Sequence, residues 1–247
     1  MAARLFEFAS PRDVGLLVET CLDLHDHEHL LEGHPDEWDH EVNLEGLTPV
    51  FGYSSNPSPV ALAHKFASIP EVRIPVLACE VEGYDAVYSR HVSAGYIPAT
   101  ITESPGTILK GFMTYLTEEE LRVMNDSESR GVNYELEPLE GATGVLTDDG
   151  SEIKNPLTYV SLHGVLEFDG QPRAVEGTVA ENRQFEELPQ AEALDAVMAA
   201  VAPEERRDQC IGTAIVILTQ RKAWTARLKD VHTFLPTSKF RESRKHP

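Results

Sequence analysis

Hydrophobic residues are spaced differently in the middle of the chain and at its two ends. Between about residues 48 and 170, short apolar runs alternate with clusters of Gly, Pro, Ser and Asn, which is typical of strands joined by tight turns. Before residue 25 and beyond residue 180, apolar residues recur at helical spacing. The pattern predicts a mixed α+β domain, rich in strands at its centre and with helices at both ends.

The central part is predicted to consist mainly of strands that are separated by turn signals. A Pro-Gly turn at 105–106 should separate two of them, and an Asp-Asp-Gly turn at 148–150 should close a hairpin. The predicted strand segments lie at 49–52, 72–89, 97–104, 107–116, 133–153 and 158–168. The segment 72–89 holds one or two strands, and 133–153 is the hairpin.

The predicted helices carry start and stop signals. A Ser-Pro pair opens an amphipathic pattern over 10–24, and a capping-box pattern, Thr-Glu-Glu-Glu, opens a short helix over 117–128. An apolar stripe over 60–66 indicates a helix directly after the first strand and its loop, and a further stripe over 188–201 ends before a proline. The apolar run 210–224 fits either a buried strand or a helix.

Composition narrows the class of protein. The 247 residues carry a net charge of -20, with 41 acidic and 21 basic side chains, which argues against nucleic acid or an anionic membrane as the main partner. No apolar run reaches the roughly 18 residues of a membrane span, and the first residues do not resemble a signal peptide. Cys21, Cys79 and Cys210 have no paired spacing, so we expect reduced thiols in an acidic cytoplasmic protein.

Familiar catalytic signatures are missing from the sequence. It contains no GxSxG, GxxxxGK[ST], HExxH or GxGxxG pattern. Two other features remain as candidates. The polar loop 53–57 between a strand and a helix is either an ordinary turn or a place where backbone N–H groups bind an anion. Glu128, at the end of the short predicted helix, is either a solvated surface group or a functional carboxylate.

Histidines gather near the N-terminus among many carboxylates. His25 and His29 are four residues apart and would share one face of a helix, a spacing that allows two imidazoles to bind one divalent ion. The alternative is a solvated acidic connector. The histidines of this cluster are His25, His27, His29, His34 and His40.

The order of the central motifs resembles that of the γ-glutamylcyclotransferase-like family. The family's first strand ends in a Tyr-Gly-Ser-Asn loop, similar to residues 51–56 here, Phe-Gly-Tyr-Ser-Ser-Asn. Downstream, residues 111–116 are similar to its GxxYxL strand, and a short helix then leads to a glutamate and a tyrosine. The resemblance covers about residues 48–165 and extends plausibly through the helix near 190–201.

The resemblance implies a small mixed β-barrel with flanking helices and an enzyme of the amine lyase or acyltransferase type. Such an enzyme cyclises the γ-glutamyl group of a γ-glutamyl amine or amino acid to 5-oxoproline and releases the amine, with no cofactor and no metal. Glu128 would be the catalytic general acid/base. The implied substrate-binding residues are Tyr53, Ser54, Ser55, Asn56, Tyr134 and, less directly, Tyr159.

One residue of the loop departs from the family pattern. Ser54 replaces a glycine, and a serine would be strained there if the position required a positive φ. One alternative function is therefore a non-catalytic small-molecule-binding protein on the same fold, and the histidine cluster suggests another, a metal-binding protein. We expect a helical extension rich in His and acidic residues at 1–47 and the cyclotransferase-like domain at 48–202. A strand or helix extension with a basic tail should follow at 203–247. A homodimer is left open.

Overall fold

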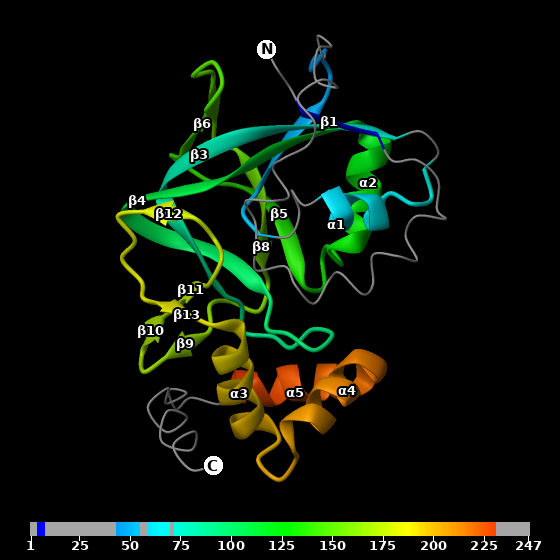
Figure 1. The fold of residues 1–247 in the computed structure, drawn as a ribbon, viewed down its shortest axis with the longest axis vertical. Coiled ribbons are helices and arrows are strands. Elements are labelled where there is room, and N and C mark those ends of the chain that lie inside the picture. The colour runs from blue at the N-terminus through cyan, green and yellow to red at the C-terminus, as the bar shows by residue number, and fades with distance from the viewer. Residues whose placement is uncertain (1–3, 8–42, 55–58, 70–71, 231–247) are drawn as a thin grey trace.

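The structure is a computed structural model that describes residues 4–7, 43–54, 59–69 and 72–230 (Figure 1). Two long antiparallel strands form its centre, β3 (Arg73–Tyr88) and β4 (Ala99–Leu116). The strand β2 (Thr48–Gly52) lies antiparallel to β4 and parallel to β8 (Leu157–Ser161). This arrangement places the end of β2, where the polar loop begins, in the interior of the sheet.

The remaining strands are short and extend the sheet at its edges. The strand β5 pairs with β8, β11 pairs with β3 and β13, and β12 pairs with β4. Three more strands, β1, β6 and β7, form pairs off the main path, and β9 and β10 form a separate ribbon. Their bounds are β1 Arg4–Glu7, β5 Tyr134–Pro138, β6 Thr143–Leu146, β7 Glu152–Lys154, β9 Glu167–Phe168, β10 Gln171–Pro172, β11 Ala174–Val175, β12 Ala180–Glu181 and β13 Glu187–Leu188.

The mixed α+β class predicted from the sequence is confirmed, but a closed barrel is not. The strand order is β13-β11-β3-β4-β2-β8-β5, and within the part of the chain that the structure describes the terminal strands β13 and β5 do not pair. The sheet is therefore open along this path. Closure requires the first and last strands to meet with a consistent stagger, which the very short β11 and β13 do not provide.

The strand predicted to end at the Pro-Gly turn in fact continues through it. Glu82 pairs with Ile108 and Tyr84 with Glu103, so residues 104–107 lie opposite Gly83 alone. The extra residues form an irregular bulge, in which the side-chain oxygens of Ser104 and Thr107 are 2.7 Å apart. The prediction of two strands was wrong because the partner strand β3 accommodates the Pro-Gly pair as a bulge instead of a chain reversal.

The predicted hairpin is present but narrower than expected. The strands β6 and β7 pair across the Asp-Asp-Gly turn, where Gly150 has a φ of 72°. The strand β5, which the prediction placed in the same hairpin, pairs instead with β8. This long-range pairing matters for the site because it places Tyr134 and Tyr159 on neighbouring strands.

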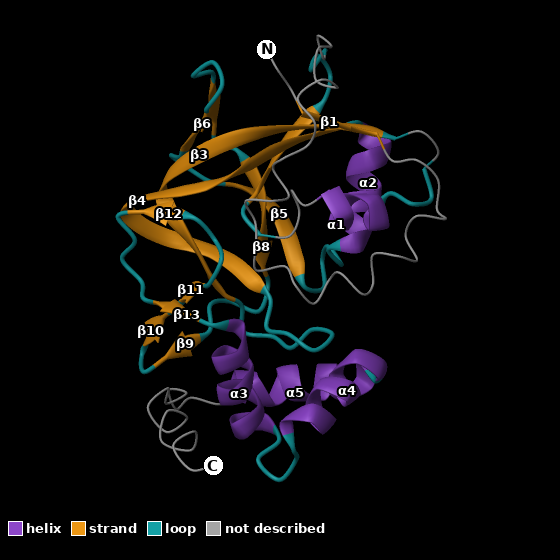
Figure 2. Ribbon diagram, viewed as in Figure 1, coloured by secondary structure: helices purple, strands orange, loops and turns teal. Residues whose placement is uncertain are grey.

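The helices of the described residues lie in two groups beside the sheet (Figure 2). The helices α1 (Pro59–Lys65) and α2 (Glu118–Ser127) lie beside one face, and α3 (Gln190–Val201), α4 (Arg207–Val216) and α5 (Leu218–Asp230) gather at the opposite end. The ambiguous run 210–224 is thus helical, with a break at Ile217. The helix predicted at 10–24 lies outside the described residues.

The helices α3, α4 and α5 share one apolar core with the end of β3. Val197 of α3 and Trp224 of α5 are fully buried in the same cluster as Tyr88. The domain boundaries at 47 and 202 stay predictions, although the packing of α3 against α5 crosses the second of them. Among the described residues, no helix is long and apolar enough to span a membrane.

A polar cavity around Glu128

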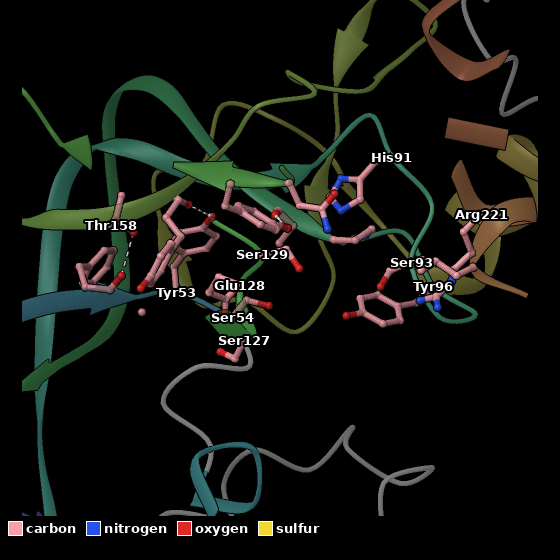
Figure 3. Close-up of a pocket in the computed structure, with 18 residues that line it drawn as sticks. Tyr53, Ser54, His91, Ser93, Tyr96, Ser127, Glu128, Ser129, Thr158 and Arg221 are labelled. Atoms are coloured by element: carbon pink, nitrogen blue, oxygen red, sulfur yellow. Dashed lines mark hydrogen bonds between the residues drawn. The ribbon is translucent and has the colours of Figure 1, made fainter. Parts of the chain in front are cut away.

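A cavity of about 420 Å³ opens where the end of β2, the end of α2, the β5–β8 pair and the start of α5 meet (Figure 3). Its volume is in the range of small-molecule sites. The residues predicted from the sequence that line it are Tyr53, Ser54, Glu128, Tyr134 and Tyr159. Ser55 and Asn56, the other two predicted binding residues, lie outside the described residues.

Glu128 is held at the cavity by the way α2 begins and ends. The predicted capping box is present: Glu120 N donates to Thr117 Oγ1 at 3.2 Å, and Thr117 N donates to Glu120 Oε2 at 2.7 Å. Glu128 is the C-cap, and its N–H donates to Met124 O at 3.0 Å. Ser129 then adopts a φ of 52°, so the chain turns away immediately after the glutamate.

The carboxylate of Glu128 forms an ion pair with Lys65, the last residue of α1. Each side chain is 15% exposed. Lys65 Nζ also lies 3.7 Å from Met124 Sδ, so its stem packs along α2. The pair therefore joins the end of α1 to the end of α2 beside the cavity.

Three tyrosines present hydrogen-bond acceptors around this carboxylate. The hydroxyl of Tyr53 donates to Tyr159 O at 2.8 Å, that of Tyr134 to Ala99 O at 2.8 Å, and that of Tyr159 to Asn125 Oδ1 at 2.9 Å. Each proton is thus already used within the protein, and the hydroxyls can offer a ligand only lone pairs.

The protonation state of these three tyrosines follows from their burial. Burial is the main cause that raises the pKa of all three hydroxyls, and the negative charge of Glu128 adds to it. The phenols therefore stay neutral at ordinary pH. Besides its ion pair with Lys65, Glu128 thus has neutral acceptors near it, and the carboxylate with these acceptors is suited to a ligand ammonium group that displaces Lys65.

A glycine fixes the close approach of β2 to β4 beneath the cavity. A Cβ on Gly111 would lie 2.5 Å from Gly52 O and 2.8 Å from the Phe51 ring. On the other side of β2, Thr158 Oγ1 donates to Phe51 O at 2.8 Å. The glycine that the sequence analysis assigned to the GxxYxL strand thus has a local physical role, since no other residue leaves room for the backbone that leads into the Tyr53 turn.

The strain considered for Ser54 does not arise. The described non-glycine residues with positive φ are Ser129, Asn155, Asp169 and Asn182, and Ser54 is not one of them. The Ser54 side chain is exposed at the cavity. A serine is therefore compatible with the backbone at this position.

Other cavity residues were not found by sequence reasoning. His91, Tyr96 and Arg221 all line the cavity, and they come from the segment after β3 and from α5. No motif marks them, because their place depends on how α5 packs against the sheet. His91 is only 4% exposed and its Nδ1 lies 2.7 Å from Ser89 Oγ.

His91 is held neutral in this position. Burial is the main cause that lowers its pKa to about 3, with smaller contributions from the neighbouring His163 and from Lys229. The two imidazole rings lie 4.6 Å apart, and burial likewise lowers the pKa of His163. This pair supports the cavity wall as a neutral, hydrogen-bonded cluster.

Metal binding was the other chemistry suggested by the sequence. Within the part of the chain that the structure describes, no group of three or more His, Cys, Asp or Glu side chains is arranged to hold a metal ion. The histidine cluster predicted near the N-terminus lies outside those residues. The metal-binding alternative therefore stays a prediction.

Comparison with known proteins gives matches to solved structures alone: no protein-family profile and no curated protein matches the chain. YkqA from Bacillus subtilis is 14% identical over 49% of this chain and 44% of its own length, with a TM-score of 0.37. The chain thus spans less than half of that protein.

Two further solved structures carry names that agree with the resemblance noted in the sequence. A gamma-glutamyl cyclotransferase is 13% identical over 73% of this chain and 87% of its own, with a TM-score of 0.40. A glutathione-specific gamma-glutamyl cyclotransferase from yeast is 12% identical over 79% and 99%, with a TM-score of 0.32. At these TM-scores the matches do not indicate the chemistry of the site.

Proposed function

We propose that the protein is a γ-glutamylcyclotransferase-type enzyme that converts a γ-glutamyl amine or amino acid to 5-oxoproline and the free amine. The observation that supports this most is the position of Glu128, a carboxylate that faces a polar cavity together with Tyr53, Ser54, Tyr134 and Tyr159. These are residues that the sequence resemblance assigned to one site, although they lie up to about a hundred positions apart in the chain.

The proposed reaction requires one group that first accepts a proton and later donates it. The α-amine of the substrate attacks its own δ-carbonyl carbon, a new C–N bond closes the five-membered ring, and the C–N bond to the leaving amine breaks. Glu128 accepts the proton from the α-ammonium and returns it to the nitrogen of the leaving amine. Reaction requires the α-nitrogen and the carbonyl carbon to approach within about 3–3.5 Å, so binding must fold the substrate.

The substrate ammonium would bind where acceptors are concentrated. We propose that it lies between the carboxylate of Glu128 and the lone pairs of the tyrosine hydroxyls, whose protons are held by protein oxygens. Backbone N–H groups of the Tyr53–Ser54 turn are the proposed donors to the α-carboxylate or to the developing oxyanion.

Lys65 gives the free enzyme a specific resting state. Its ammonium pairs with Glu128 before substrate arrives. In our proposal the substrate ammonium competes with Lys65 for the same carboxylate.

The test is an assay against a panel of γ-glutamyl amines and amino acids, with 5-oxoproline detected by mass. We expect the wild-type protein to form product and Glu128→Gln to lose at least about 10²–10⁴-fold in rate, the range of general acid–base catalysis. Glu119→Gln, on the exposed part of the same helix, is the matched control and should retain full rate. Product from Glu128→Gln at an undiminished rate would contradict the proposal.

A second candidate function is binding without turnover. The ion pair with Lys65 favours it, because the carboxylate that would take the proton is already in contact with a cation of the protein. In this case γ-glutamyl compounds should bind to the folded wild-type protein, as measured by calorimetry, while no 5-oxoproline appears.

A further inference from the structure

Arg221 is a cation in the cavity wall that has no anionic partner among the residues that the structure describes. It lies in the first turns of α5, and its Nε is buried without an acceptor among the described residues. Buried polar groups in folded proteins nearly always have a hydrogen-bond partner, which can be a ligand. The exception is notable in a chain with 41 acidic and 21 basic residues.

Other arginines of the same protein are paired with carboxylates. Arg130 pairs with Glu135, and Arg183 pairs with Asp85 through Nε at 3.1 Å. Arg173 Nη1 lies 3.3 Å from Glu186. Because carboxylates are abundant and these three arginines each lie beside one, the lack of a carboxylate partner for Arg221 among the described residues indicates that a ligand can supply the anion.

The position of Arg221 shows which part of a ligand it would meet. Figure 3 draws Arg221 beside Tyr96 at one end of the cavity and Tyr53 toward the other, with Glu128 between them. Leu218, three residues before Arg221 and on the same side of α5, also lines the cavity. The start of α5 therefore forms the wall across from the proposed γ-glutamyl site.

We propose that Arg221 binds the α-carboxylate of the amino acid that leaves, so that the enzyme prefers γ-glutamyl amino acids to uncharged γ-glutamyl amines. This inference rests on the proposed function, since it takes the γ-glutamyl end to lie at Glu128 and the Tyr53 turn. A planar guanidinium donates two parallel hydrogen bonds to a carboxylate, so it distinguishes a leaving amino acid from the same amine without its carboxylate.

The test uses two compounds that differ only in that carboxylate, γ-glutamylalanine and γ-glutamylethylamine. For wild type we expect the higher kcat/KM with γ-glutamylalanine. Arg221→Met keeps most of the apolar stem and removes the charge, and it should lower the ratio of the two kcat/KM values by about 10- to 100-fold. Arg221→Lys should restore part of that preference, because it returns the charge without the planar fork.

Lys222→Met is the matched control on the same helix. Lys222 is exposed and does not line the cavity, so its removal makes the same change in net charge without touching the site. An unchanged ratio in this variant, beside a reduced ratio in Arg221→Met, supports the proposal and excludes a general electrostatic effect.

Two outcomes would overturn the inference. An equal loss on both compounds in Arg221→Met would mean that Arg221 binds the carboxylate that the two compounds share. No change on either would mean that it binds neither. Dissociation constants of both compounds are measured by calorimetry alongside, so the preference for the carboxylate is tested even if neither compound is turned over and the proposed function itself fails.

Discussion

Two ion pairs in this protein have similar chemistry and different surroundings. Lys65 and Glu128 meet at the cavity, where each side chain is 15% exposed, whereas the Asp85 side chain is completely buried against Arg183. A carboxylate at a cavity can exchange its partner for a ligand. A carboxylate enclosed by the protein cannot, so the comparison separates a site that can take part in chemistry from a contact that joins two segments.

The buried pair has protein partners on both of its side chains. Asp85 Oδ1 accepts from Ala86 N at 2.8 Å, and Oδ2 lies 3.1 Å from Arg183 Nε. Arg183 Nη2 donates at 3.0 Å to both oxygens of Thr178. Burial raises the pKa of Asp85, and the charge of Arg183 opposes that rise. The pair therefore attaches the segment that carries β12 and β13 to the long strand β3.

The largest effect on stability should come from breaking this buried pair. Asp85→Asn leaves the charge of Arg183 without its buried partner, and we expect a loss of about 3 kcal/mol in the free energy of unfolding, the lower end for such a change. Urea denaturation at pH 7 measures it. Glu128→Gln is the comparison, and it should cost less stability while it affects the rate; a greater loss of stability in Glu128→Gln would reverse the distinction between the two pairs.

A buried histidine at the cavity should give an effect that is absent at pH 7 and grows as the pH falls. The folded state lowers the pKa of His91 from 6.5 to about 3, so below pH 6.5 the unfolded chain takes up a proton that the folded chain does not. Stability should therefore fall as the pH falls from about 6.5 toward 3, by up to about 1.4 kcal/mol per pH unit from this group.

The variant His91→Asn isolates this contribution from the many carboxylates that also titrate. Urea denaturation at a series of pH values from 7 to 4 should give a shallower decline for the variant than for wild type. Parallel curves would show that His91 takes up its proton in the folded state as readily as in the unfolded one.

The smallest effect is expected from the cation of the cavity pair. Lys65→Met should change the free energy of unfolding by less than about 1 kcal/mol, because the pair is partly exposed. Substrate ammonium would no longer compete with Lys65, so KM for a γ-glutamyl substrate should fall by up to about fivefold. Steady-state kinetics separate the two roles: a fall in kcat without a fall in KM would mean that Lys65 positions Glu128 instead of competing with the substrate.

The parts of the site that the sequence predicted are those set by local chemistry. The capping box at Thr117 fixes where α2 begins, and the turn after Ser127 fixes where it ends, so the position of Glu128 follows from a short stretch of sequence. Gly111 was noted only as part of the GxxYxL strand of the family resemblance, and its close contact with Gly52 and Phe51 comes from the structure.

The parts that the sequence did not predict depend on contacts between distant segments. The bulge in β4 exists only because Gly83 of β3 lies opposite it, and β5 leaves its expected hairpin to pair with β8. Arg221 lies in a run that fitted either a strand or a helix, and its place at the cavity depends on α5, which packs through Trp224 into the core that it shares with α3 and the end of β3. No local pattern encodes these placements.

Both ends of α2 are fixed, so the number of residues between them determines where Glu128 points. Each residue in an α-helix turns the chain by about 100° and advances it by about 1.5 Å. One residue inserted between Glu120 and Met124 would rotate the carboxylate away from Lys65, even though no side chain of the site had been altered. The direction in which the proposed acid–base group points therefore depends on the length of α2, which is ten residues.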